Sequence, residues 1–236
     1  PNILICCPTN ITTIEQKAII EAAEKSGGKN VYLEEEPKVA AIGAGMDIFQ
    51  PSGNMVIDIG GGTSDIAVLS MGGIVTSRSL KVAGDQLDNE ITQFVKKTHK
   101  LLIGERTAET IKKEIGTVFP GKRDDSMEVR GRDMITGLPR TITITSDEVQ
   151  KATAESMMMI VQQAKDVLEQ TPPELSADII DRGIILTGGG ALLDGIDQLF
   201  SEQLRVPVFA AEQPLDSVAL GTGILLENMT KKKRKF

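Results

Sequence analysis

Residues 55–63 read Met-Val-Ile-Asp-Ile-Gly-Gly-Gly-Thr, an apolar segment followed by three glycines and a threonine. The apolar residues predict a buried strand, and the three glycines remove the side chains that would keep a ligand away from the backbone. After the glycines, Ile66, Val68 and Ser70 alternate with Ala67 and Leu69, which predicts a second strand. We therefore expect a hairpin whose glycine loop uses positive φ to turn backbone N–H groups towards an anion.

A second glycine triplet, residues 188–190, follows the apolar run Ile184–Leu186. Four apolar residues then recur at helical spacing: Leu192, Leu193, Ile196 and Leu199. This pattern predicts a strand that passes through glycine into a helix N-terminus. Neither triplet has the spacing of a P-loop or of a dinucleotide-binding fingerprint. Two such loops in one chain indicate a nucleotide that is held from two sides.

Composition narrows the class of protein. The chain has 236 residues, of which 40% are hydrophobic and 25% charged, as in a globular protein of one large or two ordinary domains. A formal net charge of −7 argues against a general nucleic-acid binder. No stretch reaches the roughly 18 apolar residues that span a bilayer, and no signal peptide is visible. We interpret the adjacent Cys6 and Cys7 as buried strand residues of a protein from a reducing, cytoplasmic setting.

Strands alternate with helices along the chain, which predicts α/β layers. The middle differs: a charged helix over residues 104–116 precedes turns and short alternating strands, so we expect a small inserted subdomain. Thr145 then opens a long helix to Glu169 with capping-box spacing. A last helix over residues 218–229 precedes the basic tail 231–235. That tail has two interpretations, contact with an anionic membrane surface and a solvated terminus.

Asp58 is the strongest candidate for chemistry. It ends a buried strand beside the glycines and Thr63, where a carboxylate could hold Mg²⁺ through water next to phosphate oxygens. The alternative is an aspartate that caps a turn. With the glycine triplet attached, phosphate binding is the better interpretation.

Three other features have simpler structural interpretations. Asp85 is expected to cap the helix that follows it. Glu109 and Lys112 lie three residues apart on one helix face, which favours a surface ion pair. The run Met157–Met159 is expected to pack into a core or between subdomains.

The glycine loops also carry a resemblance. Residues 58–65 are similar to the second phosphate loop of the actin, sugar-kinase and heat-shock-chaperone superfamily, and residues 186–191 to its adenosine loop. Further strings narrow the match: Glu35–Pro37, Ala40–Ala44, Gly73–Ser77, Ile103–Glu109, Arg130–Asp133 and Pro172–Leu175. Together they resemble the MreB family of bacterial actin-like cell-shape proteins over nearly the whole chain. Residues 6–10 and 34–38 resemble its MreBH branch.

The resemblance implies an actin-like ATPase fold of the ribonuclease H-like class, α/β throughout. The first domain would be incomplete, and the second complete with a small inserted α+β subdomain. Residues 1–52 would form the later part of subdomain IA, residues 53–103 and 143–215 subdomain IIA, and residues 104–142 the inserted IIB. Residues 216–236 would return to IA as a helix with the basic tail. Because the chain opens at Pro1, we expect the family's first phosphate loop and hydrophobic membrane loop in a preceding segment.

Roles for individual residues follow from the same resemblance. The ATP phosphates would contact Gly60, Gly61 and Gly62, while Asp58 would organise Mg²⁺ through water. One wall of the ribose and adenine pocket would be Glu109, Thr110, Ile111 and Lys112. The adenosine would be closed in by Gly188, Gly189, Gly190 and Ala191. Glu36 and Thr63 would orient the attacking water, so that catalysis consists of positioning and charge stabilisation.

The implied function is an ATP-dependent filament that maintains rod cell shape. Its expected partners are further copies of itself, the cell-wall elongation machinery and the inner face of the cytoplasmic membrane, without nucleic acid. It would be cytoplasmic and peripherally membrane-associated, a slow ATPase at full length and negligibly active as this segment alone. Two alternatives stay open: a small-molecule kinase or phosphatase of the superfamily, which needs an acceptor site, and a chaperone-like module, which needs a peptide-binding domain.

Overall fold

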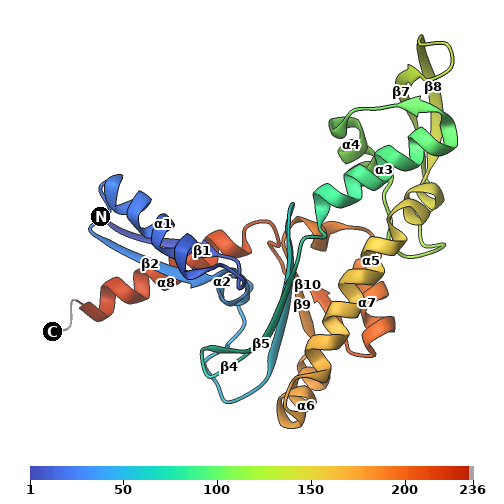
Figure 1. The fold of residues 1–236 in the computed structure, drawn as a ribbon. Coiled ribbons are helices and arrows are strands. Elements are labelled where there is room, and N and C mark those ends of the chain that lie inside the picture. Colours follow the sequence, from blue (N-terminus) through green and yellow to red (C-terminus); the bar gives the residue numbers. More distant parts are fainter. Residues whose placement is uncertain (234–236) are drawn as a thin grey trace.

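The computed structural model describes residues 1–233, built around a five-stranded sheet (Figure 1). The strand order is β10-β9-β3-β4-β5. The strands are β3 (Asn54–Ile59), β4 (Ser64–Ser70), β5 (Gly73–Leu80), β9 (Ile184–Thr187) and β10 (Val208–Ala210). β3 pairs antiparallel with β4, which confirms the predicted hairpin, and parallel with β9. Because β3 and β9 run side by side in the same direction, the two glycine loops leave the same end of the sheet.

Both faces of this sheet are covered, because β3 and β4 alternate apolar side chains between two cores. On one face, Met55, Ile57 and Ile66 pack against α5 (Ser146–Glu169), α6 (Pro173–Arg182) and α7 (Ile196–Leu204). On the other, Val56, Ala67 and Leu69 belong to a second core with α2 (Glu36–Gly43) and α8 (Ser217–Lys233). The predicted α/β layers are confirmed.

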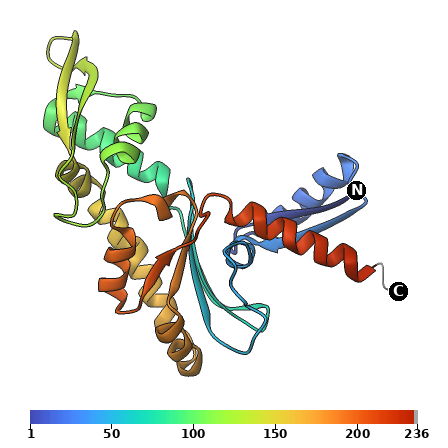
Figure 2. The ribbon, with the colours of Figure 1, turned by 180° about the vertical axis from the view of Figure 1, so that it is seen from behind.

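The two ends of the chain form one unit. β1 (Asn2–Cys7) and β2 (Asn30–Glu35) pair as a two-stranded parallel sheet, with α1 (Thr13–Lys25) between them in sequence. Figure 2 shows α8 lying beside these strands, so the last helix returns to the first residues. Cys7 is buried and Cys6 half-buried, which agrees with strand residues.

Helices α2 and α8 cross without side chains between their backbones. A Cβ atom on Gly43 would lie 1.7 Å from the carbonyl oxygen of Ser217, and one on Gly221 would lie 1.9 Å from that of Val39. No side chain fits at such distances, so the second core depends on glycine at both positions.

Replacing Gly221 with alanine is therefore expected to lower the free energy of unfolding by about 2–3 kcal/mol, since the two helices must move apart. The matched control is Gly223→Ala on the same helix, where a Cβ would meet nothing within 4 Å. The control should be neutral or gain up to about 1 kcal/mol from helix propensity. Urea unfolding of both variants tests this, and equal effects would contradict the crossing described here.

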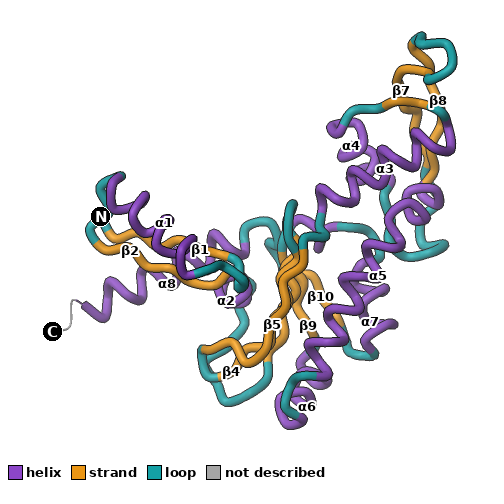
Figure 3. Tube along the Cα trace, in the orientation of Figure 1, coloured by secondary structure: helices purple, strands orange, loops and turns teal. Residues whose placement is uncertain are grey.

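A second unit, which we call the outer unit, lies at the C-terminal end of α3 (Gly84–His99) and the N-terminal end of α5 (Figure 3). It contains α4 (Glu105–Ile115) and an antiparallel sheet of β6 (Leu101–Leu102), β7 (Ser126–Asp133) and β8 (Pro139–Thr145). Its core includes Ile91 of α3 and Val149 of α5, on either side of residues 104–142. The α+β insertion is present, and two long helices join it to the central sheet.

The helix starts agree only in part with the sequence predictions. Thr145 caps α5 with Glu148 in the expected capping box, and Thr12 caps α1 with Glu15 in the same way. The second glycine loop leads into a short 3₁₀ helix, η1 (Gly189–Leu192), and α7 begins only after Gly195, which adopts a left-handed conformation. The expectation of a helix that starts directly at the glycines is therefore only partly met.

None of the described helices combines the length and the apolar character that a bilayer span requires. Residues 234–236, which include the last two positions of the basic tail, lie outside the described part of the chain.

Candidate functional site

A cavity of about 680 Å³ lies where the two glycine loops meet α3 and α4. Ligand pockets commonly have volumes of this order. Gly60 and Gly61 line it from one loop and Gly189 and Gly190 from the other. The remaining wall is charged on the side of the helices, through Asp85, Asp88, Glu109 and Lys112, and apolar on the side of η1, through Leu192, Leu193 and Leu215. The sequence prediction that both triplets serve one site agrees with this arrangement.

The first glycine loop leaves open space above its backbone. A Cβ on Gly62 would meet nothing within 4 Å, and one on Gly61 would approach only the Asp85 carboxylate, at 3.3 Å. None of these three glycines has positive φ, so that part of the expectation is wrong for this loop. Neither a left-handed backbone conformation nor a close contact with protein backbone requires glycine at Gly61 or Gly62.

Backbone hydrogen bonds hold the first loop in place. The N–H of Gly60 donates to the carbonyl of Thr63 at 2.9 Å and closes the turn. The first N–H groups of α3 hold the loop from outside: Gly84 donates to Gly60 at 3.1 Å and Asp85 to Gly61 at 2.8 Å. The N-terminus of α3 therefore supports the loop itself.

The second loop needs glycine for packing. Gly188 has φ of +79°, and a Cβ there would lie 2.3 Å from the carbonyl oxygen of Ile59. A Cβ on Gly190 would lie 2.3 Å from Cγ2 of the same isoleucine. These two glycines let the loop lie directly against the end of β3. Gly189 lines the cavity beside Leu215.

A cluster of carboxylates lies on the face of the sheet that meets α2. Asp58 is 7% exposed and accepts a hydrogen bond of 2.6 Å from the Thr187 hydroxyl. Asp65 stands directly opposite Asp58 in the β3–β4 ladder, so both side chains share one face. Asp65 is fully buried, and no described residue donates a hydrogen bond to either of its carboxylate oxygens.

Burial dominates the acid–base behaviour of this cluster. It raises the pKa of Asp58, an effect that the Thr187 hydroxyl opposes and the neighbouring Asp65 carboxylate reinforces. Burial also raises the pKa of Glu36 at the start of α2, with further contributions from Asp65 and Asp58. Asp65 is the residue to which sequence reasoning gave no role. The available signal was a charged residue next to the apolar run 66–69 of a strand that is buried from Ser64 to Leu69.

The predicted ligand residues divide into groups. Six of them line the cavity: Gly60, Gly61, Glu109, Lys112, Gly189 and Gly190. Five others do not: Glu36, Asp58, Gly62, Thr63 and Gly188. Ile111 is buried in the core of the outer unit and Ala191 in that of the central sheet. The exposed Thr110 directs its hydroxyl to the carbonyl of Arg106 at 2.8 Å. No finding tests the ligand, metal or catalytic role of any of these residues, so all of these roles stay predictions that rest on the resemblance.

Two structural interpretations are wrong. Asp85 does not cap α3, whose N-cap is Ala83 without a side-chain hydrogen bond; its carboxylate lines the cavity instead. Glu109 and Lys112 do not pair. Glu109 pairs with Lys113 at 2.5 Å, and both of these exposed residues line the cavity, while Lys112 reaches across to Asp88 at 2.8 Å. Lys112 and Lys113 both line the cavity but pair with different carboxylates, which sequence spacing did not predict.

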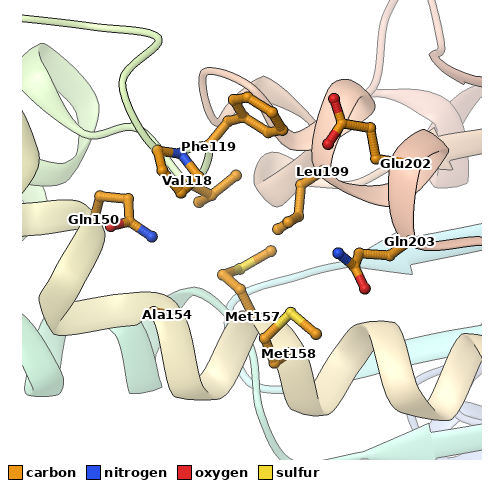
Figure 4. Close-up of a pocket in the computed structure, with 10 residues that line it drawn as sticks. Val118, Phe119, Gln150, Ala154, Met157, Met158, Leu199, Glu202 and Gln203 are labelled. Carbon is orange, nitrogen blue, oxygen red and sulfur yellow. The ribbon is translucent and has the colours of Figure 1, made fainter.

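A second cavity of about 370 Å³ lies between α5, α7 and the segment 118–120 (Figure 4). Met157 and Met158 lie along one side of it and Leu199 along the other. Met157 is buried in the core of the central sheet as expected, whereas Met158 and Met159 are largely exposed. This cavity is separate from the glycine loops.

The chain is similar to known proteins over nearly its whole length. Residues 1–234 match the family model of the MreB/Mbl protein. Cell shape-determining protein Mbl of Bacillus subtilis (strain 168) is 70% identical over 100% of this chain and 71% of its own length. MreB 5 of Spiroplasma citri bound to AMPPNP has a TM-score of 0.94 at 39% identity, covering 98% of this chain and 70% of that one.

A MamK double helical filament has a TM-score of 0.81 at 21% identity, over 96% of this chain and 68% of that one, and therefore shows a shared fold. These relatives do not test the narrower resemblance to the MreBH branch, which stays a prediction.

Proposed function

Since the chain belongs to the MreB/Mbl family and has its actin-like fold, we propose that it binds ATP between its two glycine loops and, with ATP bound, assembles into cell-shape-determining filaments. The observation that carries the proposal is the convergence of both loops on one cavity, with open space above Gly61 and Gly62. The related MreB 5 at 39% identity was crystallised with an ATP analogue. Further partners that we propose are the cell-wall elongation machinery and the inner face of the cytoplasmic membrane.

The carboxylate cluster fits a hydrated Mg²⁺ ion. The oxygens of Asp65 are buried without a donor, and such groups are costly unless they are satisfied when the site is loaded. No group of three or more acidic, histidine or cysteine side chains in residues 1–233 is placed to hold a metal directly, which favours contact through water. Asp58 and Asp65 would hold the ion, and it would supply positive charge against the phosphates.

The remaining residues bind and orient. The backbone of residues 60–62 leaves room for phosphate groups, and the apolar side chains of Leu192, Leu193 and Leu215 offer a surface for a base. Glu36, beside the carboxylate cluster, and Thr63, at the end of the loop, would orient a water molecule. Orientation without a strong base suits the slow hydrolysis expected of a cytoskeletal protein. Family membership favours this function over a small-molecule kinase or a chaperone module.

Sedimentation with and without ATP tests the proposal. The full-length protein should pellet with ATP and show filaments by electron microscopy, and Gly61→Val should abolish pelleting because its side chain enters the cavity beside Asp85. Gly73→Val is the matched control, since a Cβ at the start of β5 meets nothing nearer than 3.9 Å. Failure of the unmodified protein to assemble, or unchanged assembly of Gly61→Val, would refute the proposed function.

A further inference from the structure

Lys112 and Lys113 both line the cavity, and Lys112 is the more buried of the two. Its ammonium lies 2.8 Å from Oδ1 of Asp88, and the two side chains are only 12% and 13% exposed. The same Nζ donates a hydrogen bond of 2.9 Å to the carbonyl of Gly84. By contrast, the neighbouring Lys113 forms its pair with Glu109 on the open surface, at 68% and 46% exposure.

Gly84 connects this lysine to the first glycine loop. Its carbonyl accepts from Lys112 while its N–H donates to the carbonyl of Gly60 at 3.1 Å. A Cβ on Gly84 would lie 3.3 Å from that Gly60 oxygen and 3.5 Å from Nζ of Lys112, so the three groups are closely packed. A continuous chain of contacts therefore runs from α4, in the outer unit, through the start of α3 to the first glycine loop.

Asp88 is the charged partner of Lys112 in this series of contacts. It lies one helical turn after Gly84 on α3, so one side chain from α4 reaches both a carbonyl and a carboxylate of the same helix turn. Burial raises the pKa of Asp88, and the adjacent Lys112 ammonium opposes that rise. Without Asp88, a long flexible lysine would have only a neutral carbonyl to fix its position.

We propose that Asp88 is a positioning residue for nucleotide binding: it fixes Lys112 against Gly84, so that α4 supports the first glycine loop in the shape that receives phosphate. Asp88 acts through Lys112. This inference rests on the proposed function, because it assumes that nucleotide occupies the cavity.

The test is a double-mutant cycle on the full-length protein, with the Kd for ATP and the thermal midpoint measured for the unmodified protein, Asp88→Asn, Lys112→Met and the double variant. Asp88→Asn keeps the shape of the side chain and removes its charge. We expect either single change to weaken ATP binding about five- to tenfold, and the double variant to bind no more weakly than Lys112→Met. Asp147→Asn, which breaks the exposed pair with Lys151, is the control and should leave the Kd unchanged.

The thermal midpoints separate positioning from folding. Lys112→Met leaves a buried carboxylate without its partner, so its midpoint should fall and should partly recover in the double variant. A lowered midpoint of Asp88→Asn with an unchanged Kd would overturn the inference, as would losses of affinity that multiply in the double variant. Absence of ATP binding by the unmodified protein would instead refute the proposed function.

Discussion

Gly188→Val is expected to lower the free energy of unfolding by about 4 kcal/mol or more. Two costs combine at this position. A β-branched residue would have to adopt φ of +79°, and its Cβ would lie 2.3 Å from the carbonyl oxygen and 2.6 Å from the carbonyl carbon of Ile59. Both contacts are with the backbone of a buried strand, which cannot turn aside as a flexible side chain could. Urea unfolding followed by far-UV circular dichroism measures the loss.

Gly62→Val is the matched control from the other loop. Its Cβ would have no neighbour within 4 Å and its φ is not positive, so the free energy of unfolding should change by less than about 1 kcal/mol. ATP-dependent assembly should nevertheless be lost, because the side chain occupies the space proposed for phosphate. Equal loss of stability in both variants would show that the two loops do not differ as described.

Asp58→Asn is expected to change stability in opposite directions with and without nucleotide. Without nucleotide the variant should be more stable near neutral pH by about 1 kcal/mol, or about 2–4 °C in the thermal midpoint, because a buried charge is removed. With saturating Mg-ATP, the unmodified protein should gain about 3 kcal/mol at 100-fold excess over Kd, and the variant should gain far less.

The pH dependence of that stability has a definite sign. Because the folded-state pKa of Asp58 is raised, the folded protein binds more protons than the unfolded chain between the ordinary value, near 3.9, and the raised one. Stability without nucleotide should therefore fall as pH rises through this window, and Asp58→Asn should flatten the fall. The raised pKa of Glu36 acts with the same sign.

Urea unfolding between pH 4 and pH 8 measures this slope, with the exposed Asp181→Asn as the control for loss of one negative charge. An unchanged slope in Asp58→Asn, or a nucleotide-free variant less stable than the control, would contradict the assigned burial of Asp58. If Mg-ATP stabilised the variant as much as the unmodified protein, Asp58 would not be part of the proposed magnesium site.

Sequence alone determined the features that depend on neighbours along the chain. A short apolar run before Gly60–Gly62 and an alternating stretch after them specified the β3–β4 hairpin, since both patterns are visible over a few residues. The spacing of Thr145 and Glu148 specified the start of α5 for the same reason, because a capping box is local. The family resemblance rested on such short strings, and the predictions of an actin-like fold and of a bound nucleotide rested on that resemblance.

Tertiary structure decided which side chains meet, because those contacts join residues far apart in the chain. Asp58 and Thr187 are separated by 129 positions, yet their strands are parallel neighbours that bring hydroxyl and carboxylate within 2.6 Å. Two glycine triplets that look alike in sequence differ in the fold, since Gly188 and Gly190 are pressed against Ile59 while Gly62 borders open space. Lys112 likewise pairs with Asp88 on the neighbouring helix, although helical spacing predicted Glu109 as its partner. The pair lies between α3 and α4, where shielding from water strengthens the attraction between the two charges.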